Sequence, residues 1–456
     1  GTTGPATRLQ RGLDRGVRAT CDVLVVGGGV LGAWTAAIAA RRGATVALAD
    51  QFEPAHTRGS SHGDGRIFRL AYHQEHYVDM MLHSLPLWQQ LQDFAGEPLM
   101  ATTGGINIAS AREALADLQN LYERRGFAHE LMTAAEVNAR WPQFALSADL
   151  HALYQPDYGV LFASRCVGTA WRYAASLGAE LRTGWRAASV EGVKGGAGAE
   201  GGALRVTSES GEAIEAKAVV FAPGAWLTPL AASLFGLAIP TKVTAETVSY
   251  FAPTRGGAAA GVDHSHRAMP VFIHDGPNGL GEYGYYGLPM IDVPGMASVS
   301  GVKVSAHYCG PHVLYPDARP RAAGGVGEHG DAATEAAAAA RVAEVVASSA
   351  RLVGASCPHL ETVPLRSQSC LYTSTADHDY LLDLLPPPRL PAAAAGVRVV
   401  LMGGGSGHAF KMAPALGDCA AALALGEEPP LDLRPFAMRR LLGGDPHGAQ
   451  GQGLRH

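Results

Sequence analysis

Short apolar runs, separated by polar or glycine-rich turns, dominate the hydrophobic pattern of this chain. Residues 22–26 form one such run and 45–49 a second, with a segment of helical character at 31–42 between them. Similar runs return at 218–221 and 399–402, each followed by a glycine-containing turn. Continuous apolar runs are typical of strands that are covered on both faces, as in a parallel sheet. We therefore predict an α/β fold whose parallel sheet is assembled from distant parts of the sequence.

One apolar stretch has the length of a membrane span, but its glycines argue against one. Residues 23–40 carry no charge, and about 18 residues can cross a bilayer. A cluster of glycines at 27–29, with Gly32, lies near the middle of the stretch. Such a cluster would weaken a helix, whereas a strand, a turn and then a helix would use it well. We predict a soluble motif and no membrane association.

The terminal and low-complexity segments carry no readable chemistry. Residues 1–20 hold four arginines, one acid and no apolar core, so we expect a flexible tail, or the remnant of an organelle-targeting segment, and no secretory signal. Residues 431–456 are predicted to be a second tail in which no peroxisomal Ser-Lys-Leu address is readable. We expect a cytoplasmic protein, with a peroxisomal location as the alternative. The segments rich in small residues are expected to be surface additions. We predict a hairpin loop at 195–202, and in the alanine- and glycine-rich run that begins at 322 a loop that leads into a helix at 333–352.

Length and composition narrow the possible classes of protein. A chain of 456 residues is too long for one ordinary core and favours two or three domains, or two interleaved ones. Hydrophobic residues make up 47% of it, which excludes wholesale disorder. The net charge of -5 excludes a nucleic-acid binder that depends on a positive field. The six cysteines lie far apart without a CxxC pair, which argues against a disulfide scaffold and against a zinc ribbon.

A dinucleotide-binding fingerprint follows the first apolar run. Gly27, Gly29 and Gly32 form a G-x-G-x-x-G pattern that opens the predicted helix, and Val30 and Leu31 lie within it. Glycines at these positions let the backbone approach a pyrophosphate at the positive end of the helix, and they let helix and strand pack closely. These five residues are therefore predicted cofactor contacts.

The acid at the end of the second strand narrows the choice of dinucleotide. Asp50 lies eighteen residues after Gly32, where a carboxylate can accept the ribose hydroxyls. An acid at this position favours NAD or FAD over NADP. Several further strand-to-glycine turns suit a long cofactor that lies across the sheet, so we favour FAD. A non-enzymatic NAD-binding regulatory module is the alternative.

Four ordered motifs lie beyond the fingerprint. They are GSSHGDGRIFRLAY at 59–72, YGLP at 286–289 with GVKVSAH at 301–307, SCLYT at 369–373 with DHD at 377–379, and GSGHAFK at 405–411. Over residues 21–426 their pattern resembles that of the sarcosine oxidase, pipecolate oxidase and N-methyltryptophan oxidase family of FAD enzymes. The resemblance implies FAD as the cofactor and an amine-oxidising activity.

The first motif carries three basic side chains, His62, Arg66 and Arg69. Without context they would form a solvated basic face, and on a helix Arg66 and Arg69 would project to one side. The resemblance instead implies that His62 and Arg66 are catalytic residues that also contact the flavin, and that Arg69 binds the substrate carboxylate. Ser60 and Ser61 are expected among the cofactor contacts.

A cysteine and a lysine carry the chemistry that the resemblance implies for the flavin. By itself Cys370 would be an inert buried thiol, as we expect for the other five cysteines. The resemblance implies a thioether between Cys370 and the 8α-methyl group of the flavin. Lys303 interrupts a valine-rich strand, where burial of an unpaired ammonium is costly, so exposure on an edge strand is the alternative. The resemblance makes Lys303 a catalytic residue near flavin N5, where its charge would stabilise superoxide.

The last motif is expected to contact both the cofactor and the substrate. Lys411 follows a glycine-rich turn that comes after a predicted buried strand. The resemblance implies that Lys411 contacts the cofactor and, together with Arg69, the substrate carboxylate. Gly405 and Gly407 of the same turn are implied cofactor contacts.

The walls of the substrate pocket are the part that the motifs define least. Tyr286 and Tyr372 are expected to line the amine pocket, or alternatively to be plain core. The sequence departs from the family pattern at Gly65, at Ala409 and in the long connection 290–300. The two substitutions alter backbone freedom, and the long connection reshapes the pocket lip, so all three bear on the identity of the substrate.

The predicted architecture is a glutathione-reductase-type FAD-binding domain interleaved with a substrate-binding domain that has a largely antiparallel sheet. The pocket is expected over the flavin, at the junction of the two domains. The expected segments are 21–99, 156–236 and 367–430 for the FAD-binding domain, and 100–155 and 237–366 for the substrate-binding domain.

The expected activity is oxidation of a secondary α-amino acid of the sarcosine or L-pipecolate type to an imine, with reduction of O₂ to hydrogen peroxide. The alternative is a flavin dehydrogenase that passes electrons to a quinone or to another protein. We expect a monomer whose partners are the small amino acid and O₂, with no metal and no nucleic-acid or membrane partner.

Overall fold

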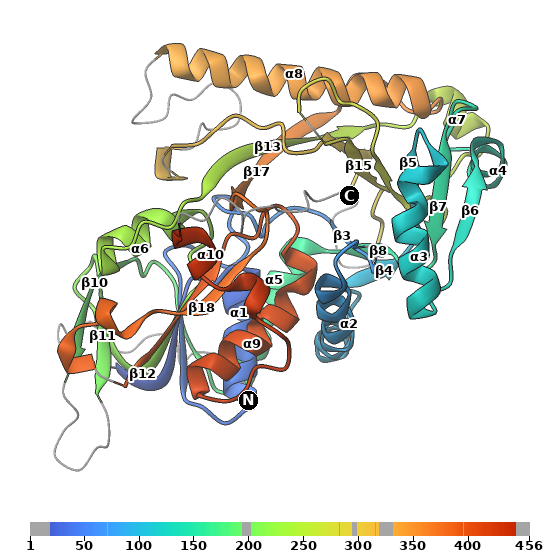
Figure 1. Ribbon diagram of the computed structural model, residues 1–456. Helices are drawn as coiled ribbons and strands as arrows, with labels where there is room; N and C mark the ends of the chain where they lie inside the picture. Colours follow the sequence, from blue (N-terminus) through green and yellow to red (C-terminus); the bar gives the residue numbers. More distant parts are fainter. Residues whose placement is uncertain are drawn as a thin grey trace, which may run out of the picture.

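Two eight-stranded sheets form the framework of the protein, and a small three-stranded sheet joins them (Figure 1). The computed structural model describes residues 19–70, 72–193, 202–281, 283–293, 299–314, 316–318, 332–394 and 396–443. Within these residues no helix combines the length and the apolar character that a membrane span requires. The apolar stretch at 23–40 is a strand, a turn and a helix, as predicted.

The first sheet confirms the predicted parallel arrangement of distant segments. β1 (Ala19–Val26) lies between β2 (Val46–Ala49) and β12 (Ala213–Phe221), and both neighbours run parallel to it. β19 (Arg398–Gly403) extends the sheet beyond β12, and β9 (Glu180–Arg182) extends it beyond β2, again in parallel. The apolar runs that the sequence pattern singled out are therefore neighbours in one sheet.

Three further strands join the first sheet antiparallel. β10 (Ala187–Val193) and β11 (Ala203–Ser208) pair with each other, β11 also pairs with β12, and β18 (Leu381–Leu384) pairs with β19. The predicted hairpin is confirmed by its two strands, while residues 194–201 of its connection lie outside the described residues.

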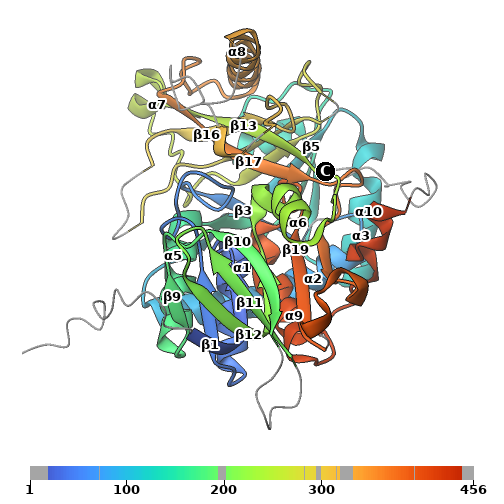
Figure 2. The same cartoon turned by 90° about the vertical axis from the view of Figure 1, so that its left-hand side faces the viewer.

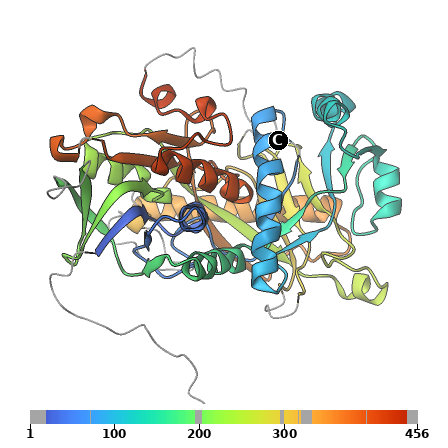
Figure 3. The same ribbon diagram turned by 90° about the horizontal axis from the view of Figure 1, so that it is seen from below.

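Helices cover both faces of the first sheet because its strands are apolar on both faces. α1 (Val30–Arg41) packs between α5 (Ala163–Ser176) and α9 (Ala413–Leu425), and these helices bury one set of β1 side chains, Val23 and Val25. The alternate side chains of β1, Leu24 and Val26, belong to a second core with residues of α6 (Leu227–Phe235) on the opposite face. In Figure 3, α2 (Glu75–Ala95, light blue) lies between these helices and the other half of the molecule.

The second sheet is largely antiparallel, as predicted, with one parallel pair between β5 and β14. Its outer face is crossed by α8 (Ala332–Ser356), which confirms the helix predicted in the alanine-rich segment (Figures 1 and 2). Its strands are, in spatial order, β17 (Arg366–Ser374), β13 (Lys242–Phe251), β16 (Val302–Ala306), β15 (Tyr285–Leu288), β14 (Val271–His274), β5 (Gly105–Ala109), β7 (His151–Gln155) and β6 (Glu130–Thr133).

The small sheet and the remaining helices complete the described structure. The small sheet has β8 in its centre, flanked antiparallel by β3 and β4. The bounds are β3 (Arg66–Phe68), β4 (Met100–Thr102), β8 (Gly159–Leu161), α3 (Ala116–Arg125), α4 (Ala134–Arg140), α7 (Arg255–Ala259) and α10 (Arg439–Leu442).

One strand crosses the predicted division of the chain. The sequence predicts that the FAD-binding domain resumes at residue 367. In the structure, β17 pairs along its whole length with β13 of the second sheet, from Ser374 opposite Lys242 to Arg366 opposite Tyr250. Backbone pairing with a distant strand decides this placement, and no local pattern announces it. Cys370 and Tyr372 therefore reach the junction from the second sheet.

The predicted C-terminal tail is wrong for residues 431–443, which pack against the body of the protein. The Phe436 side chain is 1% exposed and stacks on Tyr380 with ring centroids 5.5 Å apart. Arg440 of α10 donates to Asp377 with an Nε–Oδ2 distance of 2.7 Å. The Phe436 side chain and a partly buried ion pair help to hold this segment, and both are long-range contacts without a local signature. Residues 444–456 lie outside the described residues, as do 1–18 of the predicted N-terminal tail, whereas residues 19 and 20 already belong to β1.

Candidate active site

A cavity of about 460 Å³ lies along the carboxyl ends of the parallel strands of the first sheet. In open α/β sheets this is the side on which ligands bind. The turns after β1, β2, β12 and β19 and the start of α1 all contribute to its wall. Of the predicted cofactor contacts, those that line it are Gly27, Gly29, Val30, Leu31, Asp50, Ser60, Ser61, Arg66, Gly405 and Gly407.

The glycine fingerprint is explained by close approaches of the backbone. Gly27 has a φ of +104°, and a Cβ added there would lie 2.3 Å from the carbonyl oxygen of Ala222 at the end of β12. A Cβ on Gly32 would lie 1.8 Å from the carbonyl oxygen of Gly27. Gly32 does not line the cavity. The absence of a side chain at Gly32 instead lets α1 pack closely against β1.

Asp50 fixes the glycine turn from the end of β2. Its carboxylate accepts the N–H groups of Gly28, at 2.5 Å, and of Phe52, at 2.7 Å. Burial raises the pKa of Asp50, while these two hydrogen bonds oppose the rise. A buried carboxylate at the end of this strand is placed where a ribose would lie in a dinucleotide site.

The segment before β3 ties the start of α1 to the second sheet. The Ser61 hydroxyl accepts the N–H of Val30 at 3.1 Å, and the Ser60 hydroxyl donates to the carbonyl oxygen of Leu371 on β17. Two adjacent serines thus connect the cofactor cavity with the strand that carries Cys370.

A second cavity, of about 450 Å³, adjoins the first. Arg66, Tyr372, Gly407 and Phe410 line both cavities, so the two meet at these residues. The predicted site residues that line only the second cavity are His62, Arg69, Tyr286, Lys303, Cys370 and Lys411, and His307 and His408 of the motifs lie among them. The motifs thus converge on one place from five separate parts of the chain.

Arg66 lies on a strand, so the shared side that a helix would give Arg66 and Arg69 does not arise. Arg66 begins β3, which pairs with β8, and Arg69 follows that strand. The Arg66 guanidinium folds back onto the preceding loop and donates to the carbonyl oxygens of Ser60, at 2.9 Å, and His62, at 2.8 Å. The strand forms because β8 supplies backbone partners, which the i, i+3 spacing of the arginines could not reveal.

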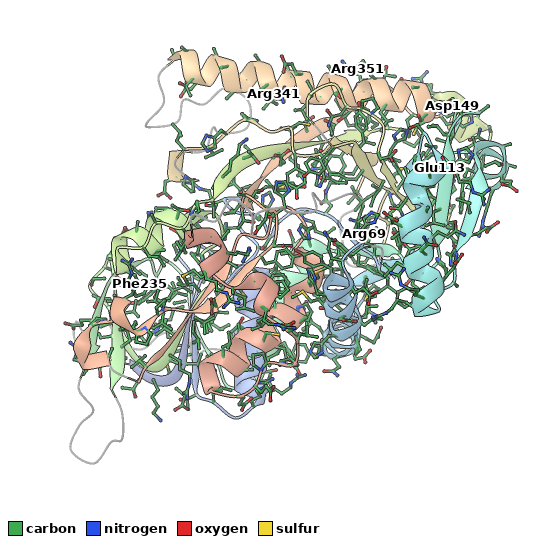
Figure 4. The ribbon with its side chains drawn as sticks, in the orientation of Figure 1. Arg69, Glu113, Asp149, Phe235, Arg341 and Arg351 are labelled. Carbon is green, nitrogen blue, oxygen red and sulfur yellow. The ribbon has the colours of Figure 1, made fainter. Side chains whose placement is uncertain are left out.

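Two buried cations, Arg69 and Lys411, converge on the second cavity (Arg69 is labelled in Figure 4). The Lys411 ammonium donates to the Tyr72 hydroxyl at 2.7 Å and to the carbonyl oxygen of His408 at 3.0 Å. The Arg69 guanidinium lies 4.7 Å from the centre of the Tyr72 ring. Burial and the nearby Arg69 lower the pKa of Lys411, and the Tyr72 hydroxyl opposes this shift. A negatively charged ligand at this end of the cavity would favour the charged forms of Arg69 and Lys411.

Lys303 is buried in the middle of the second sheet, so the edge-strand alternative is wrong. β16 lies between β13 and β15, and the Lys303 side chain is 5% exposed. Its ammonium donates to the carbonyl oxygen of Gly65 at 3.1 Å. Burial, followed by repulsion from Arg66, lowers the pKa of Lys303 to about 7. Because a lysine is charged below its pKa, this ammonium loses its proton as the pH rises through neutrality.

Aromatic side chains and a half-buried thiol complete the wall of the second cavity. Cys370 and Tyr372 lie two positions apart on β17 and so point to the same face of the strand, and Tyr286 reaches the cavity from β15. The Tyr372 hydroxyl lies 3.4 Å from His307 Nδ1. Burial, together with Arg69 and Lys411, lowers the pKa of His307 to about 3, so this imidazole is neutral near pH 7. Tyr286 and Tyr372 thus line a cavity, as expected.

The other five cysteines lie away from both cavities, and none of the six forms a disulfide. Burial raises the pKa of Cys357 and of Cys419 to about 12, which keeps these thiols protonated. Cys21 is half-buried, and its pKa is likewise raised, mainly by burial, to about 12. Cys370 differs from them in its place beside the junction of the cavities.

The sequence matches one protein family over most of its length. The model of the DAO family, described as FAD dependent oxidoreductase, matches residues 22–423. The chain belongs to the DAO family. Human peroxisomal sarcosine oxidase is 28% identical over 422 residues, which cover 92% of this chain and 96% of the relative. Monomeric sarcosine oxidase of Bacillus sp. (strain B-0618) is 27% identical with the same coverage, and N-methyl-L-tryptophan oxidase of Salmonella agona (strain SL483) is 28% identical over 92% and 98% of the two chains.

Solved structures confirm the fold of this DAO-family enzyme. NikD, described as an unusual amino acid oxidase essential for nikkomycin biosynthesis, superposes with a TM-score of 0.71 at 21% identity and covers 92% of this chain and 97% of its own. Glycine oxidase from Geobacillus kaustophilus superposes with a TM-score of 0.64 at 21% identity, over 92% and 98% of the chains. The family and these folds establish an FAD-dependent oxidoreductase with a cofactor-binding and a substrate-binding part.

The first cavity fits the FAD that the family uses. The close approach at Gly27 leaves room for backbone but not for a side chain, and Val30 and Leu31 at the start of α1 line the cavity. Such a helix start stabilises phosphates, and Asp50 lies where a ribose is expected. The shared residues at the junction would let a long cofactor extend from the first cavity toward Cys370.

Several cavity residues of the DAO-family enzyme were not singled out from the sequence. Most come from loops that no motif marks, while Ile273 and His274 lie on β14 and Gln368 lies on β17, and only the tertiary structure brings them together. The turn after β12 gave the one usable signal, a Pro-Gly pair after an apolar run. The missed residues are Trp185, Arg186, Pro223 and Trp226 in the first cavity, and His73, Ile273, His274, Asp275, Tyr283 and Gln368 in the second.

The Gly27→Ala variant should fail to hold FAD, because the added Cβ meets the Ala222 carbonyl and the positive φ disfavours an L side chain. The measurement is the ratio of flavin to protein absorbance after purification, and we expect it to fall at least about fivefold. Gly168→Ala on α5 is the matched control, since its Cβ meets nothing within 4 Å. A full complement of FAD in Gly27→Ala would contradict this explanation of the turn.

Proposed function

We propose that the enzyme oxidises the C–N bond of a secondary α-amino acid of the sarcosine or L-pipecolate type. The observation that carries the proposal is the pair of buried cations, Arg69 and Lys411, in the cavity that adjoins the cofactor cavity. A carboxylate is the partner that such cations favour, and a guanidinium can bind both of its oxygens. Lys411 and Arg69 would therefore orient an amino acid by its carboxylate beside the cofactor.

The remaining charges of the cavity favour the reactive form of the amine. Arg66 adds positive charge, as does Lys303 below its pKa of about 7, and His307 contributes a neutral ring. A positive field favours loss of a proton from a bound ammonium, which leaves the nitrogen with its lone pair. Tyr286 and Tyr372 would enclose this nitrogen and exclude water from it. The cavity thus suits an anionic amino acid whose amine is neutral.

The balanced reaction is a two-electron oxidation. The amino acid loses two electrons and two protons to give an imine, O₂ gains both to give hydrogen peroxide, and water then converts the imine to a carbonyl compound and an amine. FAD, when bound, supplies the electron acceptor between the two substrates. Lys303 would place positive charge where oxygen acquires negative charge, which supports O₂ as the acceptor. His62 and Arg66 would hold the flavin end of the junction.

The test of the proposal is a panel of amines with the purified holoenzyme. Sarcosine, L-pipecolate, L-proline, N-methyl-L-tryptophan and fructosyl amino acids are supplied in turn, and oxygen consumption and hydrogen peroxide are measured. We expect at least one secondary amino acid to give one peroxide for each O₂ consumed. Turnover only with an artificial electron acceptor would identify a dehydrogenase, and no turnover of any member would refute the proposal.

The Arg69→Ala variant should lose the carboxylate contact. Because hydrogen bonds between charged groups are strong, we expect KM for the best substrate to rise roughly 10- to 100-fold. Steady-state kinetics per bound flavin provide the measurement. Arg124→Ala removes an arginine whose side chain is 59% exposed and should leave KM unchanged. An unchanged KM in Arg69→Ala would show that the carboxylate binds elsewhere.

We also propose that Cys370 holds FAD through a thioether, because its thiol lines the cavity beside the junction. After acid precipitation the wild-type pellet should stay yellow, whereas the flavin of Cys370→Ser should pass into the supernatant. Cys21→Ser is the matched control and should behave as the wild type. Release of all flavin from the wild-type protein would refute the thioether while leaving FAD dependence intact.

A further inference from the structure

Two loops of the second sheet bring aromatic residues to the substrate cavity. The connection from β14 to β15 contributes Tyr283, and the turn that follows β16 contributes His307. The loops are joined directly, because the His307 N–H donates to the carbonyl oxygen of Gly284 at 2.9 Å. The Tyr283 ring also lies 4.6 Å from the Tyr308 ring. The position of His307 therefore depends on both loops.

The turn after β16 adopts a conformation that needs support. Tyr308 has a φ of +55°, in the left-handed region that L side chains rarely occupy. On the cavity side, Glu246 of β13, which is 1% exposed, accepts the N–H groups of Cys309 and Gly310, each at 3.0 Å. This carboxylate fixes the backbone of the turn from one face of the sheet.

Arg341 of α8 holds the same turn from the opposite face of the sheet (Figure 4). Its Nε donates to the carbonyl oxygen of Cys309 at 2.8 Å, and one terminal nitrogen donates to the carbonyl oxygen of Leu280 at 2.7 Å. One planar guanidinium thus bridges the two loops that carry Tyr283 and His307. A planar fork with fixed donors suits two acceptors in fixed positions.

The rest of the inward face of α8 makes further polar contacts with the same loops. The Ser348 hydroxyl donates to the carbonyl oxygen of Asn278 at 2.7 Å and lies 2.9 Å from the hydroxyl of Tyr285, which lines the cavity. The Ser349 hydroxyl accepts the N–H of Ala306 at 3.2 Å. The spacing of Arg341, Ser348 and Ser349 places them on one side of the helix. α8 is therefore more than the surface addition that its composition suggested.

We propose that Arg341 is a positioning residue for amine oxidation, which holds His307 and Tyr283 against the bound substrate by bridging their two loops. The proposal rests on the proposed function, because it assigns a role in that reaction. The strand pairs β13–β16 and β15–β16 do not involve the Arg341 side chain. Its removal should therefore loosen the loops and leave the sheet and the FAD cavity intact.

The test compares two arginines of the same helix. Arg341→Met keeps the alkyl chain and removes the fork, and Arg351→Met alters an exposed residue of α8 (labelled in Figure 4). With the best substrate of the panel, we expect Arg341→Met to slow anaerobic flavin reduction about tenfold or more, because small misplacements are costly in catalysis. Reoxidation by O₂ and flavin content should stay at the wild-type level. Arg341→Lys should recover part of the rate, since an ammonium can still bind one carbonyl oxygen.

A purely structural role would give a different result, in which reduction, reoxidation and flavin content all fall together. Equal reduction rates in Arg341→Met and Arg351→Met would also overturn the proposal. Hydrogen exchange of the amides at 278–281, 283–284 and 306–310 tests the bridge without any substrate, and we expect faster exchange in Arg341→Met only. If no amine is oxidised by the wild type, the proposed function fails, and unchanged exchange in Arg341→Met refutes the bridge separately.

Discussion

Four cations gather around one cavity, three of them buried, and this concentration of charge is the constraint on which the active site depends. Arg66, Arg69, Lys303 and Lys411 face a space enclosed by the second sheet and the loops of the first. Neutral oxygens partly solvate the two lysines, since Gly65 accepts from Lys303, and Tyr72 and His408 accept from Lys411. Removing such charges from water is costly unless an anion balances them. Burial, together with repulsion from Arg66, lowers the pKa of Lys303 to about 7, and the same concentration of positive charge would attract an anionic ligand.

The topology of the second sheet explains how this field is assembled beside the cofactor cavity. β17 reaches the junction as an edge strand paired with β13, and it presents Cys370 and Tyr372 to the cavity. β16 places Lys303 in the interior of the sheet, and its end leads into the turn with His307. Polar groups on both faces then fix that turn, with Glu246 on one face and Arg341 on the other. The rigid sheet thus supports a site that is built largely from its loops.

Much of the site could be found in the sequence, because its motifs are short and local. The glycine turn at Gly27, the acid at Asp50 and the parallel runs of the first sheet follow from local backbone requirements and from burial. The resemblance to the sarcosine oxidase family added Lys303, Cys370 and Lys411, and the structure brings these three to one cavity. The strand at Arg66 and the packed C-terminal segment at Phe436 could not be found this way. Both depend on partners far along the chain, β8 and Tyr380.

The sequence by itself determined the cofactor-binding turn, the strands of the first sheet and the residue types that gather at the junction. The turn and the strands follow from backbone sterics and from the period of apolar residues, which act over a few neighbouring positions, whereas the residue types at the junction follow from the motifs that resemble those of the family. Only the tertiary structure decided which sheet holds β17, which loops enclose the substrate cavity and which side chains hold those loops. The sequence of an alanine-rich helix does not show which of its side chains make specific contacts. Arg341 is important because it donates hydrogen bonds to two carbonyl oxygens of separate loops. Contacts of this kind depend on distances in space, for which the order of residues carries no local signal.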